Sequence, residues 1–559
     1  MVKHLTYEDL IRRKFAQFKY KPRKGQVELI NQILEAYIIE NKRYVILSAS
    51  TGTGKSLVAL IVSECLQELK PQSQKQTSYI IAHTNTLLKQ YDLSYNDEFD
   101  MIRVMGRNNY DCAVMLGTAE NCIAKTGIRN LMQFCGDCEY ARIKKEMKDV
   151  KHMLTNYAYL FTAARNSKDG LARRIITIFD EAHLLNEQFV SHLQITLTEE
   201  VLIKMYNYLL ELEFPDENII KTIFSCAEQI KNQKIPENNH RQFLKGINKL
   251  IEIITDFIRI ELDYALKEEN KKSFVNLNKK MSFFNDYAQK LDAFLNGTDI
   301  QYVADIKPNL IEVSPIFIQD FFKEIEFTDK YLFMSATIDE DYLNRTMKIP
   351  KEQMKFIQSP NIFDKENKTV VFCNHDFMNF EKMNSEGFIN SINQKIFQIL
   401  TEHLDERGII LTTNFKLSKQ IGEFLKKKFK ENKIDMQVII HTSKKPLKDL
   451  LEEFKDTKKP TILLSPSIFE GVDLPNDESR FQIFVKAPFY SLGSKRIQFI
   501  ANNYADIYQK MTVYRLIQGA GRSTRSEDDW CVNYFLDSHL TRLFFSEHNL
   551  WQNEFEVIR

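Results

Sequence analysis

Short apolar runs alternate with amphipathic segments along much of the chain. Runs at residues 44–47, 78–82 and 174–179 are rich in β-branched and aromatic residues, and the segments between them carry apolar residues at helical spacing. This alternation predicts the strands and helices of a doubly wound α/β unit over residues 26–107 and 140–185.

The pattern changes between about residues 190 and 315. Segments such as 201–210 and 250–260 have apolar residues three and four positions apart, which predicts a helical insertion. Strand-like runs return at 331–334 and then alternate with helices to the end of the chain. The later runs, which predict a second α/β unit from about residue 346, are 408–411, 437–440, 461–464 and 481–485.

One turn between a predicted strand and a predicted helix carries phosphate-binding chemistry. Its sequence is Ala49-Ser-Thr-Gly-Thr-Gly-Lys55-Ser56, which is a P-loop. Glycines let the backbone turn with its N–H groups inward, and the helix N-terminus favours anions. We expect Lys55 to reach the β- and γ-phosphates and Ser56 to bind Mg²⁺. The predicted phosphate-binding residues are Ala49, Gly52, Thr53, Gly54, Lys55 and Ser56.

Two further motifs suit ATP hydrolysis. The predicted strand that ends at Phe179 is followed by Asp180-Glu-Ala-His183, so Asp180 can hold the Mg²⁺ shell and Glu181 can orient and deprotonate the attacking water. Near the other end of the chain, Arg522 and Arg525 are three residues apart on one helix face. They are candidate arginine fingers for the developing charge on the γ-phosphate.

Composition sets limits on partners and location. The chain has 559 residues, which predicts three or four domains, and 76 Lys and Arg against 75 Asp and Glu give a formal net charge of +1. Any nucleic-acid surface must therefore be a local basic groove. The first residues mix acids and bases, and no segment reaches about 18 uninterrupted apolar residues. We expect a cytoplasmic protein with no membrane partner.

Half of the eight cysteines lie within one short window. A disulfide framework is not expected in a large chain without a secretion signal, so the cluster indicates a metal centre. Thiolates suit a tetrahedral zinc site and an iron-sulfur cluster alike, so ligand chemistry leaves both open. The candidate ligands are Cys112, Cys122, Cys135 and Cys138. Tyr140 and the basic residues after it suit contact with a single strand, although a solvated helix is the alternative.

The order of these motifs resembles that of superfamily-two helicases. The Gly106–Cys112 segment, the cysteines between the P-loop and the Asp-Glu-Ala-His motif, and the helical insertion before Ser335 are similar to the iron-sulfur helicases of the XPD and DinG type. The quoted motifs are Arg23-Lys-Gly-Gln26, the P-loop, Ala82-His-Thr-Asn-Thr-Leu87, Asp180-Glu-Ala-His183, Ser335-Ala-Thr337, Ser467-Ile-Phe-Glu-Gly-Val-Asp473 and the segment from Gln518 to Arg525.

The resemblance implies an α/β fold with two RecA-like domains, an iron-sulfur insertion and a helical arch. Its expected bounds are 1–107, 141–190 and 316–345 for the first RecA-like domain, 108–140 for the cluster domain, 191–315 for the arch and 346–559 for the second RecA-like domain. A fused exonuclease is not expected.

The resemblance also implies residue roles. Arg23 and Gln26 would contact adenine, and His183, Ser335 and Thr337 would couple hydrolysis to movement. A second group would line the interdomain cleft and complete the nucleotide site, namely Glu470, Gly471, Asp473, Gln518, Arg522 and Arg525. The implied cofactors are ATP, Mg²⁺ and a 4Fe-4S cluster held by the four clustered cysteines.

The predicted function is an ATP-dependent DNA helicase that moves 5′ to 3′ on single-stranded DNA and unwinds tailed or forked duplexes, acting as a monomer. One alternative is a DNA-stimulated ATPase that clamps or remodels DNA without unwinding it. Another is an RNA helicase, suggested by the Asp-Glu-Ala-His spelling alone. Protein partners of the arch cannot be inferred from the sequence.

Overall fold

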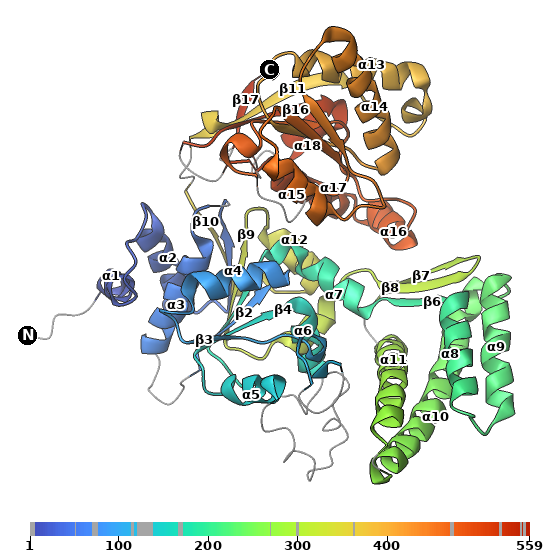
Figure 1. Ribbon diagram of the computed structural model, residues 1–559. Coiled ribbons are helices and arrows are strands. Elements are labelled where there is room, and N and C mark those ends of the chain that lie inside the picture. The colour runs from blue at the N-terminus through green and yellow to red at the C-terminus, as the bar shows by residue number, and fades with distance from the viewer. Residues whose placement is uncertain are drawn as a thin grey trace, which may run out of the picture.

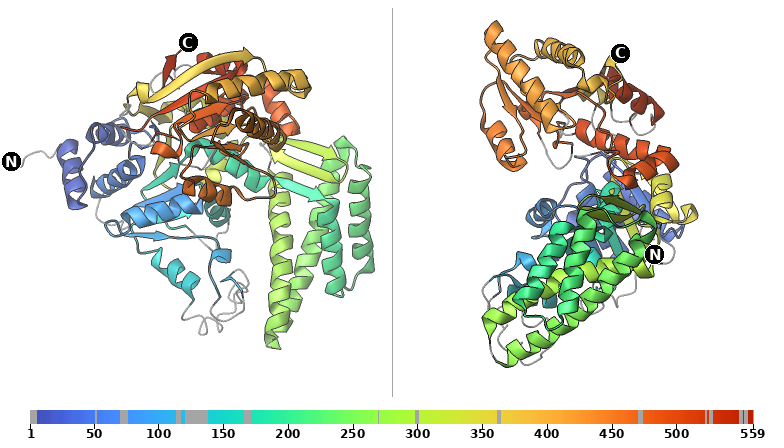
Figure 2. Two further views of the ribbon diagram at one scale, coloured as in Figure 1. Left: turned by 45° about the horizontal axis from the view of Figure 1, so that its top comes forward. Right: turned by 90° about the vertical axis from the view of Figure 1, so that its right-hand side faces the viewer.

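Two α/β units and a helical insertion make up the described chain (Figure 1). Both views of Figure 2 show the second unit stacked on the first, with the long helices of the insertion projecting away from the two sheets. The computed structural model describes residues 6–50, 52–69, 76–112, 117–119, 138–165, 171–268, 270–297, 301–360, 364–469, 474–521, 523, 524, 528–547, 551 and 555–558.

The first unit is built on a parallel sheet whose order is β10-β1-β9-β5-β2-β4-β3. Its central strands are buried along their whole length, which explains why they are continuous apolar runs. The strands are β1 (Tyr44–Ser48), β2 (Ser78–Ala82), β3 (Met101–Arg103), β4 (His152–Asn156), β5 (Ile176–Asp180), β9 (Lys330–Ser335) and β10 (Met354–Gln358). The helices are α1 (Tyr7–Gln17), α2 (Gln26–Ile38), α3 (Lys55–Leu69), α4 (Asn85–Tyr95), α5 (Glu139–Glu146), α6 (Tyr157–Arg165), α7 (Leu185–Leu193) and α12 (Glu340–Met347).

The second unit is also a parallel sheet, with the order β13-β14-β12-β15-β16-β11-β17. Its strands are β11 (Lys368–Asp376), β12 (Gly408–Leu411), β13 (Gln437–Ile440), β14 (Thr461–Ser465), β15 (Phe481–Phe484), β16 (Cys531–Asp537) and β17 (Glu556–Ile558). Its helices are α13 (Glu386–Leu400), α14 (Phe415–Asn432), α15 (Leu447–Asp456), α16 (Lys495–Asn503), α17 (Ala505–Ala520) and α18 (Ser538–Ser546).

The predicted helical insertion also contains a small sheet, which the apolar pattern of the sequence does not predict. Strands β6 (Ile195–Thr198), β8 (Leu310–Pro315) and β7 (Tyr302–Lys307) pair antiparallel where the insertion leaves and rejoins the first unit. The helices are α8 (Glu199–Glu211), α9 (Glu217–Lys231), α10 (His240–Lys267) and α11 (Lys271–Asn296). They share one buried apolar cluster with these strands, so the insertion has its own core.

The first sheet also extends past the expected boundary at residue 346. Strand β10 lies after that residue, yet it pairs in parallel with β1, with Tyr44 opposite Met354 and Ser48 opposite Gln358. The second sheet begins only with β11. The chain therefore completes the first sheet before it crosses to the second unit.

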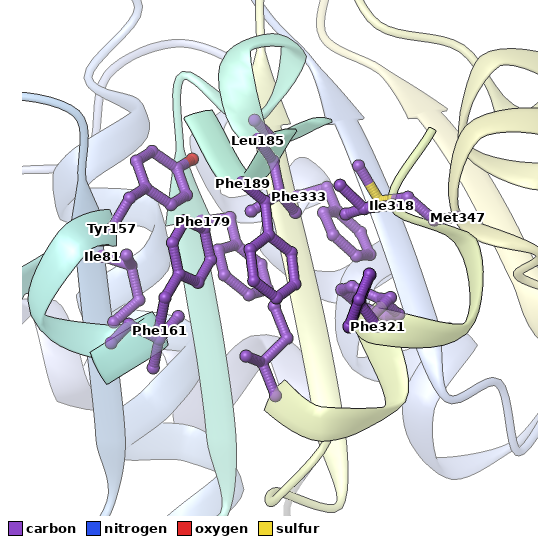
Figure 3. Packing of buried hydrophobic residues seen from close by; sticks show 14 of the residues in the cluster. Ile81, Tyr157, Phe161, Phe179, Leu185, Phe189, Ile318, Phe321, Phe333 and Met347 are labelled. Carbon is purple, nitrogen blue, oxygen red and sulfur yellow. The ribbon is translucent and has the colours of Figure 1, made fainter. Parts of the chain in front are cut away.

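Aromatic packing joins the central strands to the helices on one face of the first sheet (Figure 3). Phe179 on β5 and Phe333 on β9 stack with their ring centroids 5.3 Å apart, and Phe161 stacks on Phe189 at 4.0 Å. Burial of rings of this size contributes about 1.5–3 kcal/mol each. This cluster fixes the position of α7, the helix that follows the Asp-Glu-Ala-His motif.

Candidate nucleotide site between the two units

The P-loop has the backbone geometry that phosphate binding needs. Gly52 and Gly54 have φ angles of 82° and 78°, in the left-handed region that favours glycine. A Cβ on Gly54 would lie 2.6 Å from Nε2 of Gln26, so a side chain there would displace Gln26 from its hydrogen bond with the loop. Nζ of Lys55 donates to the carbonyl oxygen of Ala49 at 2.8 Å. The lysine is thus held over the loop in which phosphate would bind.

Gln26, the first residue of α2, and Arg23, just before that helix, hold this loop in place. Nη1 of Arg23 donates to the carbonyl oxygen of Gly52 at 2.7 Å, and Nε2 of Gln26 donates to that of Thr53 at 3.1 Å. Oε1 of Gln26 accepts from the backbone N–H of Arg23 at 2.9 Å. Contact of these two side chains with adenine remains a prediction, but both lie beside the P-loop.

A cavity of about 460 Å³ lies next to the N-terminus of α2. Its walls come from that helix, from the end of β10 and from the start of the second unit. Because Ser359 in this wall donates its N–H to the carbonyl oxygen of Ser48 at 2.8 Å, the cavity borders the segment that leads into the P-loop. The lining residues are Gly25, Glu28, Leu29, Gln32, Gln358, Ser359, Pro360 and Lys365.

Asp180 is a buried carboxylate at the carboxyl end of β5. Its Oδ2 accepts from the hydroxyl of Tyr91 at 2.8 Å, and its Oδ1 accepts from the N–H of Glu181 at 3.0 Å. Burial raises the pKa of Asp180 to about 6, with a further increase from the charge of Glu181, while Lys55 and these hydrogen bonds oppose the shift. The hydroxyl of Tyr91 also interacts with Ser56. The two predicted Mg²⁺ ligands therefore share one tyrosine.

Tyr91 was not identified from the sequence. It lies on α4, which looks like an ordinary amphipathic helix, and its hydroxyl meets Asp180 only because β2 and β5 are neighbours in the sheet. No local motif could have indicated it.

Glu181 connects the two α/β units. Its backbone is in the left-handed region, with φ of 53°, and its Oε2 accepts from Nε2 of Gln518 on α17 at 3.3 Å. Nδ1 of His183 lies 3.4 Å from the same oxygen and 2.9 Å from Oγ of Ser335. Oγ of Ser335 also accepts from the N–H of Thr337 at 3.1 Å. The residues expected to couple hydrolysis to movement thus form one connected group.

Register explains why these motifs meet. Strand β9 lies between β1 and β5, with Ser335 opposite Ser48 and Met334 opposite Asp180. The carboxyl ends of parallel strands lie at one edge of the sheet, where ligands of such folds bind. Seven expected site residues lie outside the described residues, so their positions remain predictions. They are Cys122, Cys135, Glu470, Gly471, Asp473, Arg522 and Arg525, and Thr51 of the P-loop also lies outside.

Two of the four clustered cysteines can be placed. Cys138 is buried and precedes α5, and half-buried Cys112 packs against the core of the helical insertion. Among the described residues, no group of three or more His, Cys, Asp or Glu side chains is arranged to hold a metal ion. Tyr140 is a core residue whose ring lies under the guanidinium of Arg107 at 5.1 Å, so its ring is not exposed for the contact with a single strand that the sequence suggested.

Three features define a nucleotide-hydrolysing enzyme with its site between two units. They are a P-loop, an Asp-Glu pair at the same sheet edge, and a glutamine from helix α17 of the second unit. Within the described chain, no helix is long and apolar enough to span a membrane.

Comparisons with known proteins narrow this class. Residues 397–548 match the helicase C-terminal domain family, and residues 19–214 match the type III restriction enzyme, res subunit family. A probable ATP-dependent helicase of Methanocaldococcus jannaschii is 23% identical over 92% of this chain and 91% of that protein. The ATP-dependent DNA helicase YoaA of Haemophilus influenzae is 20% identical over 94% of this chain and 92% of that protein.

Solved structures agree with these matches at the level of the fold. An XPD helicase superposes with a TM-score of 0.64 at 13% identity, covering 96% of this chain and 99% of that chain. Xpd4 of S. tokodaii gives a TM-score of 0.61 at 14% identity, covering 96% and 100%. Together the matches support a superfamily-two, ATP-dependent helicase of the XPD and DinG type, as the motif order predicted.

Proposed function

We propose that the protein is an ATP-dependent DNA helicase that moves 5′ to 3′ along single-stranded DNA and opens tailed or forked duplexes, acting as a monomer. The contact that carries this proposal is the hydrogen bond between Gln518 and Glu181, which joins the second unit to the carboxylate beside the P-loop. A change at the nucleotide can thus alter how the two units meet. Such a nucleotide-dependent change of grip is the physical requirement for movement along a strand.

Each residue of the site then has one role. Lys55 neutralises phosphate charge, and Glu181 orients and deprotonates the attacking water. Ser56 and Asp180 supply oxygen ligands that suit Mg²⁺, and both lie against the hydroxyl of Tyr91. When bound, the cation would stabilise charge on the β- and γ-phosphates. The cavity beside α2 is where we place the adenine base.

The second unit would complete the site when the cleft closes. Arg522 and Arg525 follow shortly after α17, the helix that carries Gln518, and would stabilise the charge that develops on the γ-phosphate. Glu470, Gly471 and Asp473 would line the cleft and its DNA side. Removing both arginine charges should leave ATP binding intact and abolish DNA-stimulated hydrolysis; intact hydrolysis would rule out a site shared by two units.

We further propose that Cys112, Cys122, Cys135 and Cys138 hold a 4Fe-4S cluster. The placement of Cys138 beside the first unit and of Cys112 against the helical insertion means that a shared centre would tie these two parts together. Thiolates suit such a cluster, whose main role here would be to order the segment between them. With the insertion acting as an arch, this segment would help to enclose the single strand.

Strand displacement on matched substrates tests the function. Anaerobically purified protein should open a duplex with a 5′ single-stranded tail and leave one with only a 3′ tail closed; the reverse preference would refute the polarity. Hydrolysis stimulated by DNA without any displacement would favour the clamp. Stronger stimulation by an RNA strand of the same sequence would favour an RNA helicase.

A further inference from the structure

Arg496 on α16 is a buried guanidinium with an unusually complete set of partners. Nη1 and Nη2 each donate to one carboxylate oxygen of Glu187, both at 2.8 Å. Nε donates to the carbonyl oxygens of Pro315 and Ile316 at 3.0 and 3.1 Å, and Nη2 also donates to that of Ile316 at 2.9 Å. The side chain is only 7% exposed. This planar fork of donors is specific to arginine, because a lysine ammonium cannot reach all these acceptors at once.

The partners of Arg496 belong to three different parts of the molecule. Arg496 itself lies in the second unit, whereas Glu187 lies on α7, which follows directly after Asp180-Glu-Ala-His183. Pro315 is the last residue of β8, and Ile316 begins the return from the helical insertion to the first unit. Figure 1 shows α16 above the junction of α7 with β7 and β8. One side chain therefore holds the second unit, the helix next to the catalytic carboxylates and the exit of the insertion together.

Neighbouring residues of the first unit also hold the Glu187 carboxylate in place. Its Oε1 accepts from Nδ2 of Asn186 at 2.9 Å, and Oδ1 of Asn186 accepts from the N–H of Ile318 at 3.1 Å. Burial alone would raise the pKa of Glu187, but the Arg496 charge and hydrogen bonds lower it below its usual value. The carboxylate is thus ionised in this pair, and its geometry is set by neighbours on both sides.

The helical insertion contacts α16 a second time. Nζ of Lys307 on β7 donates to the carbonyl oxygen of Gly493 at 2.8 Å, and the N–H of Lys495 donates to Oδ2 of Asp305 at 3.4 Å. Because these contacts lie at the start of α16, the insertion and the second unit meet along β7 as well as at Arg496.

Apolar packing makes this side of the interface differ from the nucleotide side. Residues of α16 and α17 belong to the same buried cluster as Phe179 and Phe333 of the first sheet, and they are Ile497, Ile500, Ile507, Met511 and Tyr514. At the nucleotide side, by contrast, the described residues Gln518 and Glu181 meet through a hydrogen bond of 3.3 Å. A packed apolar interface resists separation because opening it exposes buried side chains to water, whereas a hydrogen bond can be exchanged for one to water.

We propose that Arg496 is a positioning residue at the pivot of the motor. It holds α16 against α7 and against the exit of the helical insertion while the cleft between Gln518 and Glu181 opens and closes. Each opening then turns the second unit about this point and moves the insertion with it. The inference rests on the proposed helicase function, because it assigns to Arg496 the transfer of motion and not the chemistry of hydrolysis.

The test separates coupling from hydrolysis. Arg496→Lys keeps the charge and loses the fork, and Glu187→Gln keeps the shape and loses the charge. Arg12→Lys is the matched control, because Arg12 makes a two-nitrogen contact with Glu8 at 2.7 and 3.0 Å on the exposed helix α1. For each variant we would measure nucleotide affinity, DNA-stimulated hydrolysis and base pairs opened per ATP.

We expect Arg496→Lys and Glu187→Gln to keep nucleotide affinity and to hydrolyse ATP within about threefold of the wild-type rate, while base pairs opened per ATP fall about tenfold. The double variant should lose less than the sum of the two single losses, since both variants act on the Arg496–Glu187 pair. Arg12→Lys should match the wild type. An unchanged ratio in Arg496→Lys, or equal losses of hydrolysis and unwinding, would overturn the proposal.

The wild type could hydrolyse ATP and open no duplex, which would refute the helicase proposal but not the role of Arg496. Hydrogen exchange then tests that role without any unwinding. In the wild type, amides of α16 and of residues 315–318 should stay protected with and without a non-hydrolysable ATP analogue. Arg496→Lys should lose this protection at both segments when the analogue is added, with α1 unchanged. Equal protection in the variant and the wild type would refute the pivot.

Discussion

Replacement of Gln518 by alanine tests whether the second unit takes part in hydrolysis. Its Nε2 lies 3.3 Å from Oε2 of Glu181, slightly beyond the best hydrogen-bond distance. A hydrogen bond to a charged group contributes about 1.5–3 kcal/mol, so we take the lower end, which corresponds to roughly tenfold in rate. We expect Gln518→Ala to lower kcat for DNA-stimulated hydrolysis about tenfold and to leave ATP affinity unchanged, because the contact orients Glu181 and not the phosphates.

Gln518→Glu sharpens this prediction. It keeps the side-chain length but places a second carboxylate against Glu181, and at 3.3 Å two such charges repel by up to about 5 kcal/mol at an effective dielectric constant near 20. Its kcat should therefore fall below that of the alanine variant. Gln509→Ala is the control, since Gln509 lies on the same helix and contacts Ser546 within the second unit. Steady-state hydrolysis and binding of a fluorescent ATP analogue measure both quantities. A kcat for Gln518→Ala within twofold of the wild type, or an equal loss in the control, would refute the reasoning.

Three further predictions concern other parts of the chain. Glu181→Gln should bind ATP normally and lose at least about a hundredfold in single-turnover hydrolysis, because the general base is removed; a near wild-type rate would contradict its assignment. Cys135→Ser should bleach the brown colour and abolish strand displacement while basal hydrolysis persists; stoichiometric zinc without iron in the wild type would exclude the cluster. Burial opposes the ionisation of Glu64, but the hydrogen bond with His152 and the nearby lysines lower its pKa to about 2 from a usual value near 4.5. The contribution of Glu64 to the free energy of unfolding is therefore complete above pH 4.5 and is lost as the pH falls toward 2. Glu64→Gln should lower the free energy of unfolding, measured with urea, by about 3 kcal/mol at pH 7, because Lys14 would stay buried without this partner. The variant should also lose less stability than the wild type as the pH falls; equal losses in the two proteins would contradict this.

Much of the fold could be predicted because buried parallel strands are continuous apolar runs. Strands β2, β12 and β13 have the bounds that the runs predicted, and β1 differs by one residue. The sheet of the insertion was missed because its strands are only partly buried and lie among strongly amphipathic helices. The place of β10 was missed because a strand's partner depends on the path of the chain and not on its own sequence.

The residues of the candidate site also fall into those that the sequence could predict and those that it could not. Lys55 and Asp180 could be predicted because each follows a strand within a local motif, and parallel strands bring their carboxyl ends to one edge. Tyr91 and Arg496 could not, because each acts through a residue far away in the sequence. Tyr91 reaches Asp180 across the sheet, and Arg496 reaches Glu187 across the interface between the units.

Helix α17 explains why hydrolysis, and not the association of the units, should respond first to a change at Gln518. Earlier on this helix, Nζ of Lys510 donates at 2.7 Å to Asp339, which caps α12 just after Thr337. The same part of α17 lies in the shared apolar cluster, so the helix stays anchored there when its far end is released. Because a helix is stiff over the roughly 12 Å between Lys510 and Gln518, loss of the Glu181 contact would let that end tilt away from the carboxylate. The attacking water would then lose its oriented base while the interface around Lys510 stayed intact.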